Sequence, residues 1–123
     1  MILVTGGAFQ GKKEYVTKTF GILKEEMADG QTCEWQQIRS CRCLFHFHLL
    51  IKRMMQNGED TADLCEILME ENPKLIVVTN ELGCGIVPMD PFERQYREQC
   101  GRICCNLAKE AKEVHRVVCG IGQ

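Results

Sequence analysis

The chain has 123 residues, of which 45% are hydrophobic and 26% are charged, with a formal net charge of −2. This length suits one core, so we expect a single domain over residues 1–123. The slightly acidic balance argues against nucleic-acid binding, which needs an excess of basic residues. The apolar runs are far shorter than the ~20 residues that cross a bilayer, so we expect no membrane partner. The N-terminal apolar run follows no basic segment, which predicts no signal peptide and a cytoplasmic protein.

The nine cysteines are an odd number with scattered spacings. A disulfide framework is typical of small secreted chains, whereas reduced cysteines pack as small core side chains. We therefore expect reduced thiols.

The first half of the chain begins with a strand and continues with helices. Residues 1–5 are apolar and end at two glycines, which predicts a buried strand. Residues 12–23 have helical spacing. Residues 37–58 predict one long helix that ends at Asn57-Gly58, and residues 59–73 predict a second amphipathic helix.

The second half alternates strand, helix and strand. Residues 75–79 form the clearest strand pattern in the chain. Asp90 and Pro91 are a good N-cap and first-turn pair for a helix over residues 91–114. Residues 116–119 predict a last strand. This order predicts a three-layer α/β fold of the P-loop NTPase type, with a small, mostly parallel sheet in which the three predicted strands are neighbours.

The segment GGAFQGKK, residues 6–13, nearly matches the phosphate-loop pattern G-x-x-x-x-G-K-[S/T]. Glycines let successive backbone N–H groups curl round a phosphate, and the following helix presents its positive end to the same anion. Lys12 would reach the β- and γ-phosphates. The predicted nucleotide-binding residues are Gly6, Gly7, Ala8, Phe9, Gln10, Gly11, Lys12 and Lys13.

Lys13 stands where the pattern has a hydroxyl residue. That hydroxyl usually binds Mg²⁺, and an ammonium cannot replace it because an ammonium only donates hydrogen bonds. Two alternatives stay open. Either the loop binds phosphate, with any Mg²⁺ held only by phosphates and water, or the loop is a structural turn.

Asn80 and Glu81 directly follow the strand at residues 75–79. The carboxyl ends of parallel strands are where ligands bind in α/β proteins, so Glu81 is placed to orient a metal, a water or a hydroxyl. The alternative is that the two residues brace the loop that follows. A second candidate site consists of Asn80, Gly83, Gly85 and Arg97, in which the arginine would contact phosphate.

Cys41, Cys43, His46 and His48 lie within eight residues and have zinc-binding side chains. Residues two apart on a helix face different sides, so the four converge only if the segment is not helical. Because the segment reads as a buried helix, we predict no metal site there.

Two blocks, residues 1–13 and 77–122, resemble the bifunctional adenosylcobinamide kinase/adenosylcobinamide-phosphate guanylyltransferase family of cobalamin biosynthesis. Members of that family begin ILVTGGARSGKS and carry V-T-N-E-V-G-x-G-I-V-P, which is similar to TNELGCGIVP at residues 79–88 here. A later family pattern, R-x-F-R-x-x-x-G-x-x-N-Q, is similar to this chain at Tyr96, Arg97 and Gly101.

The chain departs from that family at identifiable places. Phe9, Gln10 and Lys13 replace an arginine and two serines of the family loop. Family members have a second strand after the first helix, and then a segment with a histidine that accepts the guanylyl group. Here the first helix runs into ADGQTCEWQQI, and no histidine matches that nucleophile. The acidic residue that ends a strand before the long helix in the family is matched to Glu34.

The resemblance implies phosphoryl transfer from GTP or ATP to the cobinamide side-chain hydroxyl, with Lys12 and Glu81 as the catalytic residues. Guanylyl transfer by the usual covalent route is not expected. The alternative is an inactive protein that keeps the fold and binds a nucleotide or a corrinoid. Because family members assemble as trimers, we also expect a homo-oligomer.

Overall fold

The computed structural model describes residues 1–7, 11–82 and 89–122. Within these residues a six-stranded sheet has the order β2-β3-β4-β1-β5-β6. Its first five strands pair in parallel, and only β6 pairs antiparallel, with β5. The strands are β1 (Ile2–Gly6), β2 (Met27–Asp29), β3 (Cys43–Phe45), β4 (Ile76–Asn80), β5 (Glu113–Val118) and β6 (Ile121–Gly122).

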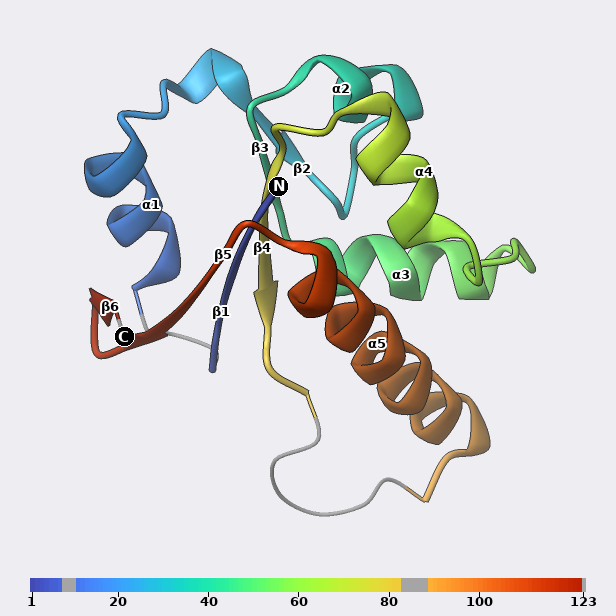
Figure 1. Cartoon of the computed structure of the whole chain (residues 1–123). Helices are drawn as coiled ribbons and strands as arrows, with labels where there is room; N and C mark the ends of the chain where they lie inside the picture. The colour runs from blue at the N-terminus through green and yellow to red at the C-terminus, as the bar shows by residue number, and fades with distance from the viewer. Residues whose placement is uncertain (8–10, 83–88, 123) are drawn as a thin grey trace.

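Helices cover both faces of the sheet, which makes three layers (Figure 1). One face packs against α1, where Val16 joins Val4 and Val78 in a buried cluster. The other face packs against the remaining helices in a larger cluster. The helices are α1 (Lys12–Phe20), α2 (Trp35–Ser40), α3 (Phe47–Gln56), α4 (Leu64–Glu71) and α5 (Pro91–Glu110), with a 3₁₀ turn η1 (Lys24–Glu26).

The three strands expected from sequence are neighbours, because β1 lies between β4 and β5. Successive residues of β1 point to opposite faces, so Leu3 joins the cluster under α3–α5 while Val4 joins the cluster under α1. Because both faces are covered, the central strands β1 and β4 are nearly continuous apolar runs, whereas β5 carries Glu113, His115 and Arg116. The mostly parallel three-layer α/β fold is confirmed.

The single long helix expected over residues 37–58 is wrong, because the segment forms α2, β3 and α3. Every residue of β3 is buried, and the strand pairs with β2 on one side and β4 on the other. A short apolar run that is buried on both faces has no alternating pattern, so its periodicity does not separate strand from helix. Between strand and helix, His46 takes a left-handed backbone conformation with φ 55°.

Helix ends agree with the sequence where a capping signal is strong. Asp90 accepts a hydrogen bond from the Phe92 N–H at 2.8 Å, and Pro91 begins α5 as expected. The amphipathic helix expected from residue 59 begins later, at Leu64, because Asp60 instead accepts the Ala62 N–H in a turn. None of the helices in the described ranges has the length and apolar character of a membrane span.

Candidate functional site

The loop between β1 and α1 has the backbone features of a phosphate cradle. Gly11 is the N-cap of α1 and has φ 78°, a left-handed conformation that favours glycine. A Cβ at Gly6 would collide with the carbonyl oxygen of Val117, so β5 can approach the end of β1 only if this residue is glycine. Of the other predicted nucleotide-binding residues, Ala8, Phe9 and Gln10 lie outside the described residues.

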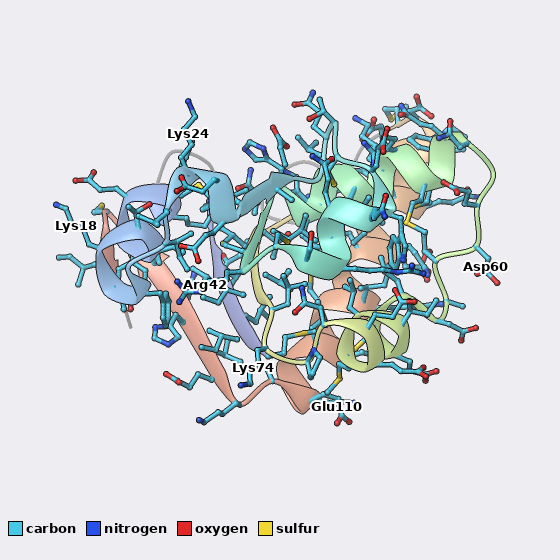
Figure 2. All side chains as sticks on the ribbon, turned by 90° about the horizontal axis from the view of Figure 1, so that it is seen from above. Lys18, Lys24, Arg42, Asp60, Lys74 and Glu110 are labelled. Carbon is cyan, nitrogen blue, oxygen red and sulfur yellow. The ribbon has the colours of Figure 1, made fainter. Side chains whose placement is uncertain are left out.

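A cleft of about 970 Å³ opens beside this loop, between α1 and the carboxyl ends of β2, β3 and β4. The first turn of α1 contributes Lys12 and Lys13 to its wall, and the strand ends contribute polar side chains. Residues of the wall used below are Gly11, Lys12, Lys13, Asp29, Phe45, His46, His48 and Asn80. Lys18 and Lys24 stand at its outer edge, and their side chains extend away from the ribbon (Figure 2).

Lys12 points back to the loop, where its Nζ donates to the Gly7 carbonyl oxygen at 2.6 Å. Partial burial lowers the pKa of Lys12, and the nearby charge of Glu81 opposes that shift. A phosphate at the N-terminus of α1 would offer this ammonium a stronger, charged acceptor than a neutral carbonyl.

Glu81, which directly follows β4, forms hydrogen bonds to residues of β1 and β5. Its N–H donates to the Gly6 carbonyl at 2.8 Å, and its carboxylate accepts from Arg116 of β5 at 3.0 Å. Sequence analysis missed Arg116, because only the pairing of β1 with β5 brings it beside the end of β4. Glu81 therefore lies next to Lys12 and carries its own cationic partner.

Lys13 lies over the cleft, with Nζ 5.9 Å from the centroid of the Phe45 ring. It brings a positive charge to the position where the phosphate-loop pattern has a magnesium-binding hydroxyl. No group of three or more His, Cys, Asp or Glu side chains in the described part of the chain could hold a metal ion. The side chain at position 13 cannot itself serve as a magnesium ligand, because an ammonium only donates hydrogen bonds. The helix expected over segment 41–48 is not formed, because β3 lies within it.

Two histidines in the cleft wall are held by polar contacts that sequence analysis did not foresee. His46 Nδ1 lies 2.9 Å from Asp29 Oδ1, on the neighbouring strand end. His48 Nδ1 accepts the Asn80 N–H at 3.2 Å. Burial lowers the pKa of His48 to about 4, helped by the positive charges of Lys12 and Lys52 and by the neighbouring His46 ring. The centroids of the His46 and His48 rings are 6.0 Å apart.

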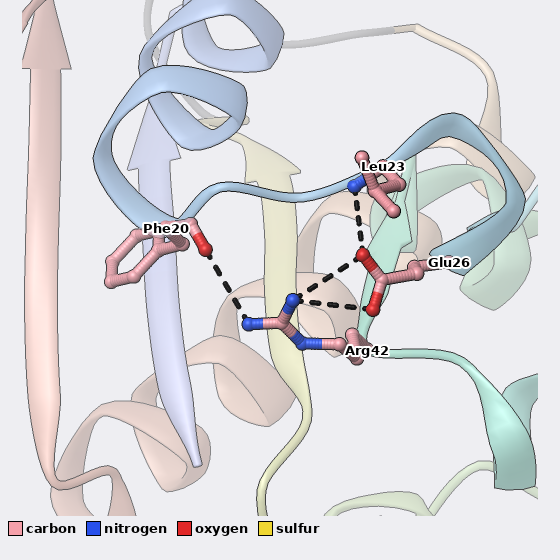
Figure 3. A network of polar contacts seen from close by, with 4 residues as sticks. All are labelled: Phe20, Leu23, Glu26 and Arg42. Carbon is pink, nitrogen blue, oxygen red and sulfur yellow. Dashed lines mark hydrogen bonds and ion pairs between the residues drawn. The ribbon is translucent and has the colours of Figure 1, made fainter.

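An ion pair between Arg42 and Glu26 braces the segment that connects α1 to β2. Arg42 Nη1 contacts both carboxylate oxygens of Glu26, at 3.3 and 3.2 Å, and its Nη2 donates to the Phe20 carbonyl at 3.4 Å (Figure 3). Glu26 also accepts the Leu23 N–H at 2.9 Å. These bonds tie the end of α1 to the segment before β3.

Two members of the second candidate site are among the described residues, and they lie on different elements of the fold. Asn80 lines the cleft, whereas Arg97 lies on α5, in the layer on the other side of the sheet. Gly83 and Gly85 lie outside the described residues. Glu34 does not occupy the place of the acidic residue that ends a strand before the long helix in the family, because Glu34 is the N-cap of α2. The residue between β3 and α3 is His46.

Comparison with known proteins gives consistent matches. The model of the family described as cobinamide kinase/cobinamide phosphate guanyltransferase matches residues 38–123. The bifunctional adenosylcobalamin biosynthesis protein CobU of Salmonella typhimurium is 30% identical over an alignment that covers 99% of this chain and 97% of that protein. The protein of the same name from Escherichia coli is 49% identical over 49 residues, which cover 40% of this chain and 27% of that protein.

The first alignment spans 181 positions, against the 123 residues of this chain. A substantial part of the Salmonella protein therefore has no counterpart here. The family match nevertheless includes β3, β4, β5 and β6, four of the six strands described, and the helices α3, α4 and α5 that cover one face of the sheet. On these matches, the chain belongs to the cobinamide kinase/cobinamide phosphate guanyltransferase family.

Proposed function

We propose that the chain binds GTP or ATP at residues 6–13 and transfers the γ-phosphoryl group to the side-chain hydroxyl of cobinamide. The observation that carries this proposal is the combination, at one cleft, of the left-handed Gly11 at the N-terminus of α1 with the ammonium group of Lys12. Backbone N–H groups and a lysine at a helix N-terminus are suited to a triphosphate.

Each described residue has a distinct role in this proposal. Lys12 would leave the Gly7 carbonyl and bind the β- and γ-phosphates, where it offsets the charge that develops on the leaving group. Lys13 would add positive charge at the same end of α1. Glu81, braced by Arg116, would keep the Lys12 ammonium directed along the strand ends or orient the acceptor hydroxyl.

The volume of the cleft, about 970 Å³, is of the order of the largest small-molecule sites. It can hold the triphosphate and the side chain of a larger acceptor whose corrin ring stays outside. We do not assign guanylyl transfer, because the segment that follows the second strand, residues 30–42 between β2 and β3, contains no histidine.

One observation favours a second candidate function, an inactive nucleotide-binding protein. Lys13 replaces the magnesium-binding hydroxyl, and the described side chains offer no other protein-held metal site. Such a protein would bind the triphosphate without transferring it.

A calorimetric titration with GTP and with ATP, followed by a turnover assay with cobinamide, separates the two candidates. We expect micromolar binding by the wild-type protein and a loss of about 10- to 100-fold for Lys12→Ala, which is the usual range for a charged hydrogen bond. Lys74→Ala is the matched control, because Lys74 is exposed at the opposite end of β4.

Binding with turnover supports the kinase proposal, whereas binding without turnover supports the inactive candidate. If neither nucleotide binds, or if Lys12→Ala binds as the wild type does, the loop is a structural turn and the proposal is wrong.

A further inference from the structure

We infer that His46 accepts the proton of the attacking hydroxyl in the transfer reaction, and that Asp29 is the positioning residue that holds its ring. The inference rests on the proposed function, since it assigns a role within the same cleft. The juxtaposition that carries it is an imidazole at the end of β3 and a carboxylate at the end of β2, 2.9 Å apart, in the cleft that Lys12 lines.

The Asp29 contact decides which ring nitrogen is available. Partial burial would raise the pKa of Asp29, but hydrogen bonds from the Gln31 N–H and the His46 ring, with the charge of Lys13, outweigh it and hold that pKa below its usual value. An ionised carboxylate only accepts, so the bond requires a proton on His46 Nδ1. The lone pair of the neutral ring then lies on Nε2, the form that a general base needs.

His46 Nε2 has no hydrogen-bond partner among the residues that the structure describes. The ring is about half exposed, at 51%, and it is part of the cleft wall. A hydroxyl group bound in the cleft can therefore reach it without displacing a protein contact.

The backbone conformation of His46 and the neighbouring ends of β2 and β3 set the position of the His46 ring. His46 is one of two non-glycine residues with positive φ in the described part of the chain, a strained conformation that often occurs at functional sites. Asp29 and Phe45 are register partners in β2 and β3. The Gly30 N–H donates to the Phe45 carbonyl at 2.7 Å, and a Cβ at Gly30 would collide with the His46 carbonyl.

The other two of the chain's three histidines do not have these properties. His48 is buried, and its Nδ1 already accepts the Asn80 N–H. His115 lies on β5, outside the cleft wall, and contacts the Tyr15 hydroxyl at 2.7 Å and Glu113 at 3.0 Å. The charged or titratable groups that face His46 are Asp29 from β2, Lys12 and Lys13 from α1, and His48 from α3.

The step balances as a phosphoryl transfer. The hydroxyl O–H bond breaks and its proton moves to His46 Nε2, while the hydroxyl oxygen forms a bond to the γ-phosphorus. The bond from the γ-phosphorus to the bridging oxygen breaks, and its electron pair leaves with the nucleoside diphosphate. The imidazolium is stabilised by ionised Asp29 and afterwards returns its proton to water.

The test compares His46→Gln and Asp29→Asn with the matched control His115→Gln, in steady-state turnover of cobinamide and in calorimetric binding of the nucleotide. General bases typically contribute 10²- to 10⁴-fold, so we expect His46→Gln to lower kcat at least about 100-fold while nucleotide affinity changes less than about threefold. Asp29→Asn should lower kcat by about 10-fold or more, and His115→Gln should behave as the wild type. The fall of kcat at acidic pH should be absent from the residual activity of His46→Gln.

A second measurement does not depend on turnover. Nitrogen-15 NMR of the wild-type protein should show the proton of the neutral His46 ring on Nδ1, and in Asp29→Asn this preference should weaken. A proton on Nε2 in the wild type would contradict the inference, as would wild-type kcat and pH profile in His46→Gln. If the wild-type protein binds nucleotide but never turns over, the proposed transfer itself is wrong, and this role of His46 is withdrawn with it.

Discussion

Lys13 places a second ammonium group in the first turn of α1, directly after Lys12. Its side chain lies over the Phe45 ring, and its positive charge helps to lower the pKa of Asp29. If the loop binds phosphate, Lys13 either turns outward or adds positive charge to the site. Its position over the cleft favours the second arrangement, in which the ammonium offsets phosphate charge where a divalent ion usually does so.

We predict that nucleotide binding by the wild-type protein changes less than about threefold when Mg²⁺ is added. Lys13→Ser should bind about 10-fold more weakly without the metal, since it loses one charged hydrogen bond. Added Mg²⁺ should restore much of that loss, because the serine supplies the hydroxyl that the pattern requires. Calorimetric titrations with and without Mg²⁺ measure both effects.

Lys74→Ser is the control for these titrations, since Lys74 is exposed and is not part of the cleft wall. Equal strengthening by Mg²⁺ in the wild type and in Lys13→Ser would show that Lys13 does not substitute for the metal.

At the scale of elements, α3 and β4 are joined by a contact that depends on protonation. His48 lies in the first turn of α3 and is 6% exposed, and it accepts the N–H of Asn80 at the end of β4. A protonated ring has no lone pair on Nδ1, so protonation would both break this bond and bury a charge. His46 is the N-cap of the same helix, so this contact also supports the wall of the cleft.

We predict that acid removes stability through His48. Its pKa is about 4 when folded, against the usual 6.5, so between these values the unfolded chain binds the extra proton. The contribution of neutral His48 to the free energy of unfolding is complete above pH 6.5. As the pH falls towards 4, that free energy decreases by about 3 kcal/mol. Urea unfolding at several pH values should show this slope in the wild type and in His115→Gln.

His48→Gln should show a smaller loss over the same pH range, because a glutamine side chain does not titrate. Carboxylates contribute equally to both proteins, so the difference between the two curves isolates the histidine. Identical curves for His48→Gln and the wild type would contradict the prediction.

At the scale of the whole molecule, the two faces of the sheet are covered unequally. In the described part of the chain, α2, α3, α4 and α5 lie on one face and α1 lies on the other, beside the β5–β6 edge (Figure 1). Val114 and Ile121 on this edge are 45% and 69% exposed. Exposed apolar side chains on an edge strand favour association with another chain.

We predict a homo-oligomer, with a trimer as the expected state, that buries this edge. Light scattering after size exclusion should give three times the 14.0 kDa mass of the chain. Ile121→Glu should shift the protein towards the monomer, because it places a charge in the contact. Ile67→Glu is the control, since Ile67 is 39% exposed on α4, away from this edge. A monomeric wild-type protein would rule the oligomer out.

Several features were readable from the sequence because their signals are local. The apolar runs predicted β1, β4 and β5, although each strand begins or ends a residue or more from the expected place. Asp90 and Pro91 predicted the start of α5, and the two motif glycines predicted a tight strand-to-helix connection at Gly11. The assignment of residues 6–13 to nucleotide binding stays a prediction for the experiments above.

Only the tertiary structure decided which residues far apart in the chain come into contact. The order of the strands places Asp29 beside His46, 17 residues later, and Glu81 beside Arg116, 35 residues later. Neither pair has a sequence signal, because strand pairing, and not spacing along the chain, sets which ends meet. The split of residues 37–58 into strand and helix has the same cause: β3 is a strand because β2 and β4 satisfy its backbone hydrogen bonds, and a local pattern does not contain those partners.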